Sequence, residues 1–96
     1  MVTALVLINT ERNAVNEVAD ALVEIPGVTE VYSVAGKYDL IALLRVPDNE
    51  AMARLVTSRI LEVEGIQDSE TLLAFRVHSK FDLATIFDLD SNKARN

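Results

Sequence analysis

The chain has 96 residues, half of them hydrophobic, and its 15 acidic and 9 basic side chains give a formal net charge of −6. This length and hydrophobic content indicate one small folded domain and exclude a disordered chain. The chain contains no cysteine, so it has no disulfide framework and no thiolate metal site. It contains no basic cluster, which disfavours direct nucleic-acid binding. It also lacks an apolar run of about 18 residues, so we expect no membrane span and a soluble, cytoplasmic protein.

The first segment predicts a strand followed by a helix. Residues 2–8 form a short, nearly continuous apolar run, which is typical of a strand buried on both faces. Thr10 is a candidate helix cap, and apolar residues then recur at helical spacing from residue 11 to about 25. Pro26 and Gly27 end this helix, because proline disfavours a preceding helical residue and glycine suits a helix end.

A β-hairpin is predicted next. Residues 28–34 are rich in β-branched and aromatic side chains, residues 40–46 are almost entirely apolar, and a polar turn with one glycine lies between them. Gly36 gives this turn its backbone freedom, and its missing side chain leaves nearby N–H groups open to a ligand. The alternative is a glycine that serves the turn alone.

The second half of the chain repeats the same order. Asp48 can cap a helical pattern that runs from residue 49 to about 64, Gly65 ends it, and residues 66–77 predict a fourth strand. When Gly27 is superposed on Gly65, the strands, caps and helix ends of the two halves coincide. Two such interleaved halves give an α+β, ferredoxin-like βαββαβ sandwich with both helices on one face of an antiparallel sheet.

Residues 1–78 form the predicted folded domain, and residues 79–96 form a short C-terminal helix with a flexible tail. Ser79 and Asp82 resemble a capping box ahead of a short apolar stripe. A helix of this length is marginal alone, so we expect it to dock on its own or a neighbouring subunit.

The strands pose a physical problem, because three of them are apolar on both faces. The two helices cover only one face, and leaving about half a dozen large apolar side chains of the other face in water would forgo on the order of 10 kcal/mol. Another chain must cover that face. Two sheets packed face to face as a two-fold homodimer, a dimeric α/β barrel, are the simplest solution.

The motifs at the element ends resemble one family. Residues 25–28, 31–34, 36–40 and 64–66, followed by Ser69-Glu70-Thr71, resemble in order and spacing the effector-binding domain of the Lrp/AsnC family, called the RAM domain. Because the chain begins at the first strand, it resembles a stand-alone effector domain without the helix-turn-helix of other members. One departure is Ala35, which stands where family members often have threonine, so one potential hydroxyl donor for the ligand is missing.

The resemblance implies a non-enzymatic regulator of transcription that binds small amino-acid effectors. It implies a homodimer and a ring of dimers that is commonly an octamer. Mixed assembly with full-length Lrp/AsnC regulators is our hypothesis for how such a domain acts, and the acidic charge and the lack of a long apolar run predict no direct nucleic-acid or membrane contact. No cofactor and no metal is expected. The ligand-binding residues that the resemblance implies lie at the hairpin tip and at the start of the fourth strand: Gly36, Tyr38, Asp39, Ser69 and Thr71.

The chemistry of these residues suits a free amino acid. The carboxylate of the zwitterion needs N–H or hydroxyl donors, and its ammonium needs an acceptor such as Asp39. Each residue also has a purely structural alternative: Tyr38 can pack across a subunit contact, Asp39 can brace the turn, and Ser69 and Thr71 can be ordinary residues of a strand edge.

Two other functions compete with the sensor. A structural oligomerisation module would need no ligand. A small ferredoxin-like enzyme would need polar groups facing inward, whereas the inward helical positions here are apolar, and the single histidine, His78, lies at a strand end, where an interface or junction role is favoured over a metal site.

Overall fold

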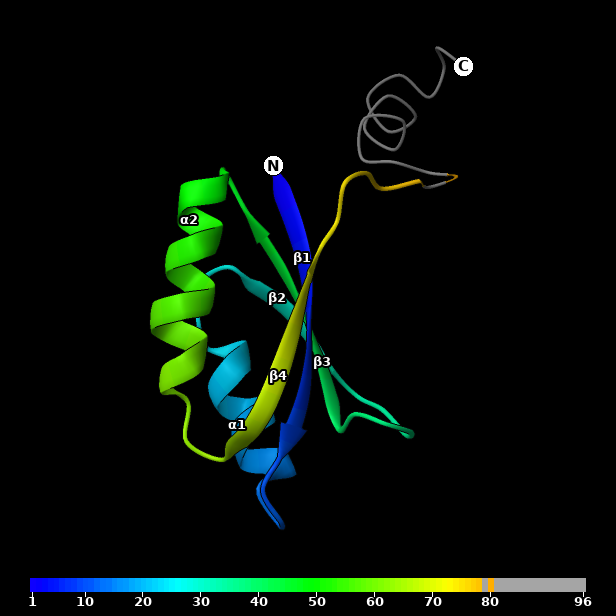
Figure 1. The fold of residues 1–96 in the computed structure, drawn as a ribbon, viewed down its shortest axis with the longest axis vertical. Helices are drawn as coiled ribbons and strands as arrows, with labels where there is room; N and C mark the ends of the chain where they lie inside the picture. The colour runs from blue at the N-terminus through cyan, green and yellow to red at the C-terminus, as the bar shows by residue number, and fades with distance from the viewer. Residues whose placement is uncertain (79, 81–96) are drawn as a thin grey trace, which may run out of the picture.

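The computed structural model describes residues 1–78 and 80, which form a four-stranded antiparallel sheet with both helices on one face (Figure 1). The strands lie in the spatial order β2-β3-β1-β4. They are β1 (Val2–Thr10), β2 (Val28–Ser33), β3 (Leu40–Val46) and β4 (Ile66–Leu73). The helices are α1 (Val15–Val23) and α2 (Asn49–Arg54), and α2 continues through the π-helical turn η1 (Leu55–Arg59) and the 3-10 turn η2 (Ile60–Glu62). This βαββαβ order confirms the predicted ferredoxin-like α+β sandwich.

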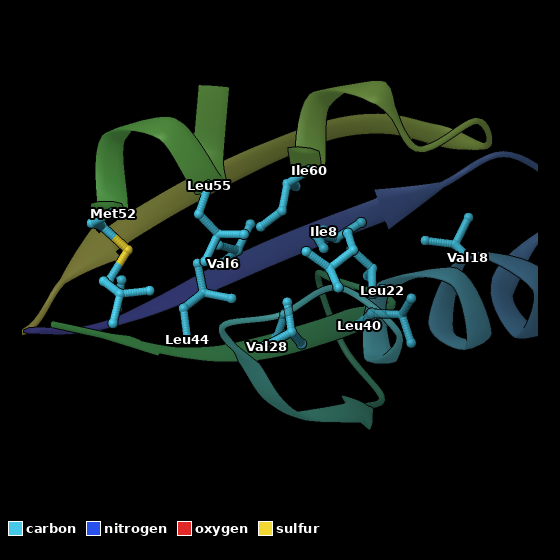
Figure 2. Close-up of a cluster of buried hydrophobic side chains, with 14 residues drawn as sticks. Val6, Ile8, Val18, Leu22, Val28, Leu40, Leu44, Met52, Leu55 and Ile60 are labelled. Carbon is cyan, nitrogen blue, oxygen red and sulfur yellow. The ribbon is translucent and has the colours of Figure 1, made fainter. Parts of the chain in front are cut away.

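The core lies between the helices and one face of the sheet (Figure 2). Along β1 the burial alternates, so that Ala4, Val6 and Ile8 are buried while the residues between them remain partly exposed. Leu22 from α1 and Ile60 from η2 complete this core, and both are essentially inaccessible to water. Each large side chain buried here contributes about 1.5–3 kcal/mol, so this face accounts for most of the hydrophobic stabilisation of the chain.

The second face of the sheet has no helix over it. Residues directly opposite each other in an antiparallel ladder point to the same face. Leu5 lies opposite Leu43 of β3 and Leu72 of β4, and Leu7 lies opposite Ile41. We refer to Leu5, Leu7, Ile41, Leu43 and Leu72 as the open apolar face. The expectation that β1 is buried on both faces is therefore wrong for the single chain, because its second face is only partly covered.

The first helix starts later than the sequence pattern predicts. Asn13 has a φ of 64°, a left-handed conformation that an α-helix cannot include, and α1 therefore begins at Val15. Thr10 is not its cap, because Thr10 ends β1 and its hydroxyl donates to Asp39 instead. The N-cap position is Ala14, which makes no side-chain capping bond.

The second helix starts as predicted. The carboxylate of Asp48 accepts a hydrogen bond of 2.8 Å from the backbone N–H of Ala51, which confirms Asp48 as the cap. Gly27 and Gly65 follow their helices with φ values of 103° and 100°, so the two predicted helix ends share one backbone conformation.

The fourth strand is shorter than the predicted 66–77. It ends at Leu73, and after the backbone N–H of Ala74 donates to Thr3 the chain leaves the sheet. The predicted C-terminal helix and tail over residues 79–96 lie, apart from residue 80, outside the described residues. None of the helices in the described part is long and apolar enough to cross a membrane.

Candidate functional site

The hairpin tip projects from the sheet between β2 and β3, away from the helices (Figure 1). The backbone N–H of Val34 donates to the carbonyl of Asp39 across its base, at 3.0 Å. Gly36 is exposed with a φ of 129°, and no described heavy atom outside Gly36 and its two chain neighbours lies within 4 Å of the position that a β-carbon would occupy. The backbone at Gly36 is therefore exposed to solvent.

Asp39 fastens the base of the hairpin to the end of β1. Its backbone N–H donates to the carbonyl of Ile8 at 2.9 Å. Its Oδ2 atom accepts hydrogen bonds from the backbone N–H of Thr10 at 2.9 Å and from the Thr10 hydroxyl at 3.3 Å. Hydrogen bonds to a charged acceptor are stronger than neutral ones, so this carboxylate braces the tip through a neighbouring strand.

Tyr38 lies in the turn just before β3, and its side chain reaches β4. Its hydroxyl donates to the Oε1 atom of Glu70 at 2.7 Å, and this hydrogen bond is the main reason why the pKa of Tyr38 is raised above its ordinary value. Glu70 lies opposite Leu7, and the side chain of Tyr38 therefore extends over the open face. Beside this contact the amide of Asn9 donates to Asp68 at 3.3 Å.

Ser69 and Thr71 point the other way. They lie opposite Ile8 and Val6, whose side chains are fully buried beneath the helices, so both hydroxyls belong to the helix-covered face. They are nevertheless exposed, because β4 is an edge strand. Neither hydroxyl makes a hydrogen bond among the described residues, and both are available to a ligand at the sheet edge.

The structure thus divides the predicted residues between two faces. Tyr38 lies with Glu70 on the open face, Asp39 is engaged with Thr10, and the two hydroxyls lie on the opposite face. Sequence reasoning missed the parts played by Thr10 and Glu70. The alternation of acidic and hydroxyl side chains along Asp68 to Thr71 was an available signal, since successive strand residues face opposite sides.

Two surface depressions lie away from the tip. One, of about 480 Å³, lies between α1 and the end of the second helical segment, and its lining includes Glu17, Ile25 and Arg59. The other, of about 210 Å³, lies beside β2 and β3 and is lined by Thr29, Glu30, Leu43 and Arg45. Neither of these two includes a predicted ligand-binding residue in its lining.

A family model described as the Lrp/AsnC ligand binding domain matches residues 3–82. The chain belongs to the Lrp/AsnC family. This match includes both helices and, apart from Val2, all four strands of the structure, and it confirms the resemblance found in the sequence motifs.

The Lrp/AsnC domain also matches curated proteins. It is 34% identical over 76 residues to an HTH-type transcriptional regulator of Pyrococcus horikoshii, covering 76% of this chain and 51% of that protein. It is 28% identical over 79 residues to the HTH-type transcriptional regulator FL11 of Pyrococcus furiosus, covering 82% and 52%. The chain spans about half the length of these relatives. Both relatives are named as transcriptional regulators.

Solved structures give the same fold. TTHA0845 from Thermus thermophilus is 49% identical with a TM-score of 0.77, and the match covers 83% of this chain and all of that one (100%). AsnC of E. coli also has a TM-score of 0.77, at 19% identity over 85% of this chain and 56% of AsnC. A transcriptional regulator of Neisseria meningitidis, solved as a complex with L-Met, has a TM-score of 0.71 at 18% identity, covering 82% and 54%.

Proposed function

We propose that this Lrp/AsnC domain binds a free amino acid at contacts between subunits and thereby regulates transcription in the cytoplasm. In this proposal the domain dimerises through the open apolar face, the dimers assemble into a ring, and the effector lies beside the hairpin tips. The output is mixed assembly with DNA-binding regulators of the same family, which changes how many DNA-binding domains each ring carries.

The open apolar face is the observation that carries the proposal. Its five aliphatic side chains form a continuous patch over three strands, and Leu72 remains 45% exposed. On the adjoining strand, Tyr32 lies opposite Ile41 and is 49% exposed. Monomers seldom expose a contiguous patch of this kind, whereas a two-fold dimer covers the same patch on both subunits.

The tip and the edge of β4 offer the groups that a zwitterion requires. Open backbone around Gly36 and the hydroxyls of Ser69 and Thr71 supply donors for a carboxylate. Asp39 uses Oδ2 for Thr10, which leaves Oδ1 as an acceptor for an ammonium group, and Tyr38 supplies an aromatic wall. The L-Met complex of the Neisseria meningitidis regulator, which shares the fold, supports the choice of ligand class.

Calorimetric titration with each of the twenty amino acids tests the ligand. We expect heat with at least one at millimolar concentration, and a combined Ser69→Ala and Thr71→Val variant should weaken that binding by about tenfold, the usual cost of one or two lost hydrogen bonds. Ser58→Ala is the matched control, because Ser58 is an exposed hydroxyl residue of η1. No heat with any amino acid would contradict the ligand part of the proposal.

A structural oligomerisation module without a ligand is the second candidate. It is favoured by the hydrogen bonds inside the chain, because Asp39 already accepts from Thr10 and Tyr38 already donates to Glu70. For such a module, amino acids should leave the distribution of oligomers unchanged in native mass spectrometry. For a sensor, the effector should shift that distribution, and Asp39→Ala should remove the shift while the ring persists.

Mixed assembly is tested by co-expression. A tagged full-length Lrp/AsnC regulator from the same organism should carry this chain with it through purification, in defined stoichiometries by native mass spectrometry. Recovery of the two chains only in separate rings would contradict the regulatory output and leave the ligand proposal intact.

A further inference from the structure

The outer surface of the helix layer contains a shallow groove. It is the depression of about 480 Å³ between α1 and the end of the second helical segment, and the backbones of the two segments approach each other at few points. Ala21, Ile25 and Val63 form the apolar part of its lining. Both helices lie on the side of the sheet away from the open apolar face (Figure 1), so the groove stays accessible when a second copy covers that face.

One wall of the groove is a flank of α1. Val18 and Leu22 of this helix are fully buried against the sheet. Glu17 and Ala21 each precede one of them by one residue and lie four residues apart, so they share the neighbouring flank, which faces the groove. Ala21 is exposed, and its small side chain keeps the groove open.

The other wall follows a change of helix type. The π turn η1 is succeeded here by the 3-10 turn η2, and Ile60 points into the core (Figure 2) while Arg59 and Glu62 line the groove. A π turn places an extra residue in one helical turn and therefore changes the direction of the side chains that follow it. π turns are frequent at functional sites, which makes this wall a candidate binding surface.

The lining carries more negative than positive charge. Glu17, Glu62 and Glu64 provide three carboxylates, and Arg59 provides one guanidinium group. None of these four side chains forms an ion pair with another residue in the described part of the chain. The carboxylates are therefore available to a cationic partner.

The charge and the apolar lining together define the occupant. Two more carboxylates, Asp20 and Glu24, are exposed on α1, so nucleic acids and anionic membrane surfaces are repelled. A metal ion is not favoured, because no three acidic or histidine side chains of the described residues are placed to hold one. Lysine and arginine side chains combine a cationic head with an aliphatic stem, which suits carboxylates beside an apolar surface.

We propose that this groove is a docking site for a lysine- or arginine-rich segment of a partner protein. Aliphatic stems of the segment lie on Ala21, Ile25 and Val63, and its cationic heads meet Glu17 and Glu62. The groove shares no residue with the predicted ligand-binding set or with the open apolar face, so this docking site is independent of the proposed effector function.

A synthetic basic peptide tests the docking site. The probe is a fluorescein-labelled peptide with two copies of the repeat Lys-Leu-Ala-Lys-Leu-Ala-Lys, and its counterpart with glutamate in place of lysine is the negative control. Fluorescence anisotropy at low ionic strength should show saturable one-to-one binding of the basic peptide to the intact chain, and no binding of the acidic one. High salt should weaken the binding, because ions screen exposed charges.

Two pairs of variants locate the binding in the groove. Glu62→Lys should raise the dissociation constant of the peptide by about tenfold, whereas Glu50→Lys makes the same charge change at the start of α2 and should raise it by less than about threefold. Ala21→Trp fills the groove without changing the charge and should also raise the constant by about tenfold. Asn16→Trp adds a tryptophan to α1 outside the groove and should leave the constant unchanged.

Arg59→Glu should have the opposite effect. It removes a cation from the lining and adds a carboxylate, so the basic peptide should bind about threefold to tenfold more tightly. Arg76→Glu is the matched control, because Arg76 is exposed and lies beyond β4, outside the lining of the groove. Tighter binding cannot result from a variant that fails to fold, so this pair keeps the test decisive.

Each contrary outcome overturns the docking site and leaves the proposed effector function standing. Such outcomes are no binding of the basic peptide, equal weakening by Glu62→Lys and Glu50→Lys, or unchanged binding to the Ala21→Trp variant. Displacement of the peptide by spermine at the same concentration of positive charge would assign the groove to small polycations and would also overturn the proposal. Weaker binding by the groove variants alone, with tighter binding by Arg59→Glu, supports it.

Discussion

The two faces of the sheet carry similar side chains in very different surroundings. On the helix-covered face, Val6 and Ile8 have no exposed surface, and on the open face the neighbouring Leu5 and Leu7 keep part of theirs. A sheet that needed only its own helices would place polar residues at alternate strand positions. β1 instead carries apolar residues for two contacts, one within the chain and one that we assign to a second subunit.

Substitutions of two adjacent residues of β1 separate these contacts and should give the largest effect. Ile8→Ala removes a fully buried side chain, so it should lower the free energy of unfolding by about 2–5 kcal/mol at every protein concentration. Leu7→Ala should cost less in the monomer and act mainly on dimerisation, so its effect should depend on protein concentration. Denaturant unfolding at two concentrations measures both. If both variants lowered the free energy of unfolding equally at both protein concentrations, the two faces of the sheet would not serve different contacts.

A medium effect is expected where the hairpin joins β1. Asp39→Ala leaves the backbone N–H and hydroxyl of Thr10 without their acceptor, so it should lower the free energy of unfolding by about 1–3 kcal/mol. Asp68→Ala is the matched control, because Asp68 is exposed and, among the residues that the structure describes, accepts only the 3.3 Å bond from Asn9. Thermal unfolding of both variants measures the difference. If the two cost the same, Asp39 does not brace the tip.

The smallest expected effect is on the pKa of Tyr38, whose hydroxyl donates to Glu70. The hydrogen bond to Glu70 raises the pKa of Tyr38, which means that the folded chain favours the protonated phenol. The stabilisation is therefore fully present below the ordinary tyrosine pKa of about 10 and is lost as the pH rises through the higher folded value.

Near-ultraviolet absorbance of the tyrosinate form measures this titration. Tyr32→Phe isolates Tyr38, whose midpoint should lie above the ordinary value, and adding Glu70→Gln should bring it back down. An ordinary midpoint in the Tyr32→Phe variant would mean that the Tyr38–Glu70 bond does not form in solution.

The elements that follow local rules could be predicted from the sequence. The apolar runs located all four strands, the glycines marked both helix ends, and Asp48 before an apolar periodic segment identified a cap. These features depend on residues that are close in sequence. The motifs that resemble the family lie at the ends of the same strands and helices.

Features that depend mainly on how distant segments of the chain pair with each other could not be predicted from the sequence. The role of Thr10 depends on Asp39, which lies 29 residues away, and the start of α1 depends on the left-handed conformation of Asn13. The face on which Ser69 and Thr71 lie depends on the register between β4 and β1. A shift of that register by one residue would exchange their face with that of Glu70, so composition alone does not decide the layout of the candidate site.

Sedimentation velocity of the unmodified chain, at low micromolar concentration and neutral pH, tests the central claim most directly. We predict that the chain sediments as a dimer or a larger assembly, and that Leu5→Asp in the middle of the open apolar face shifts it to a folded monomer. A wild-type chain that is a stable, folded monomer under these conditions would contradict the account.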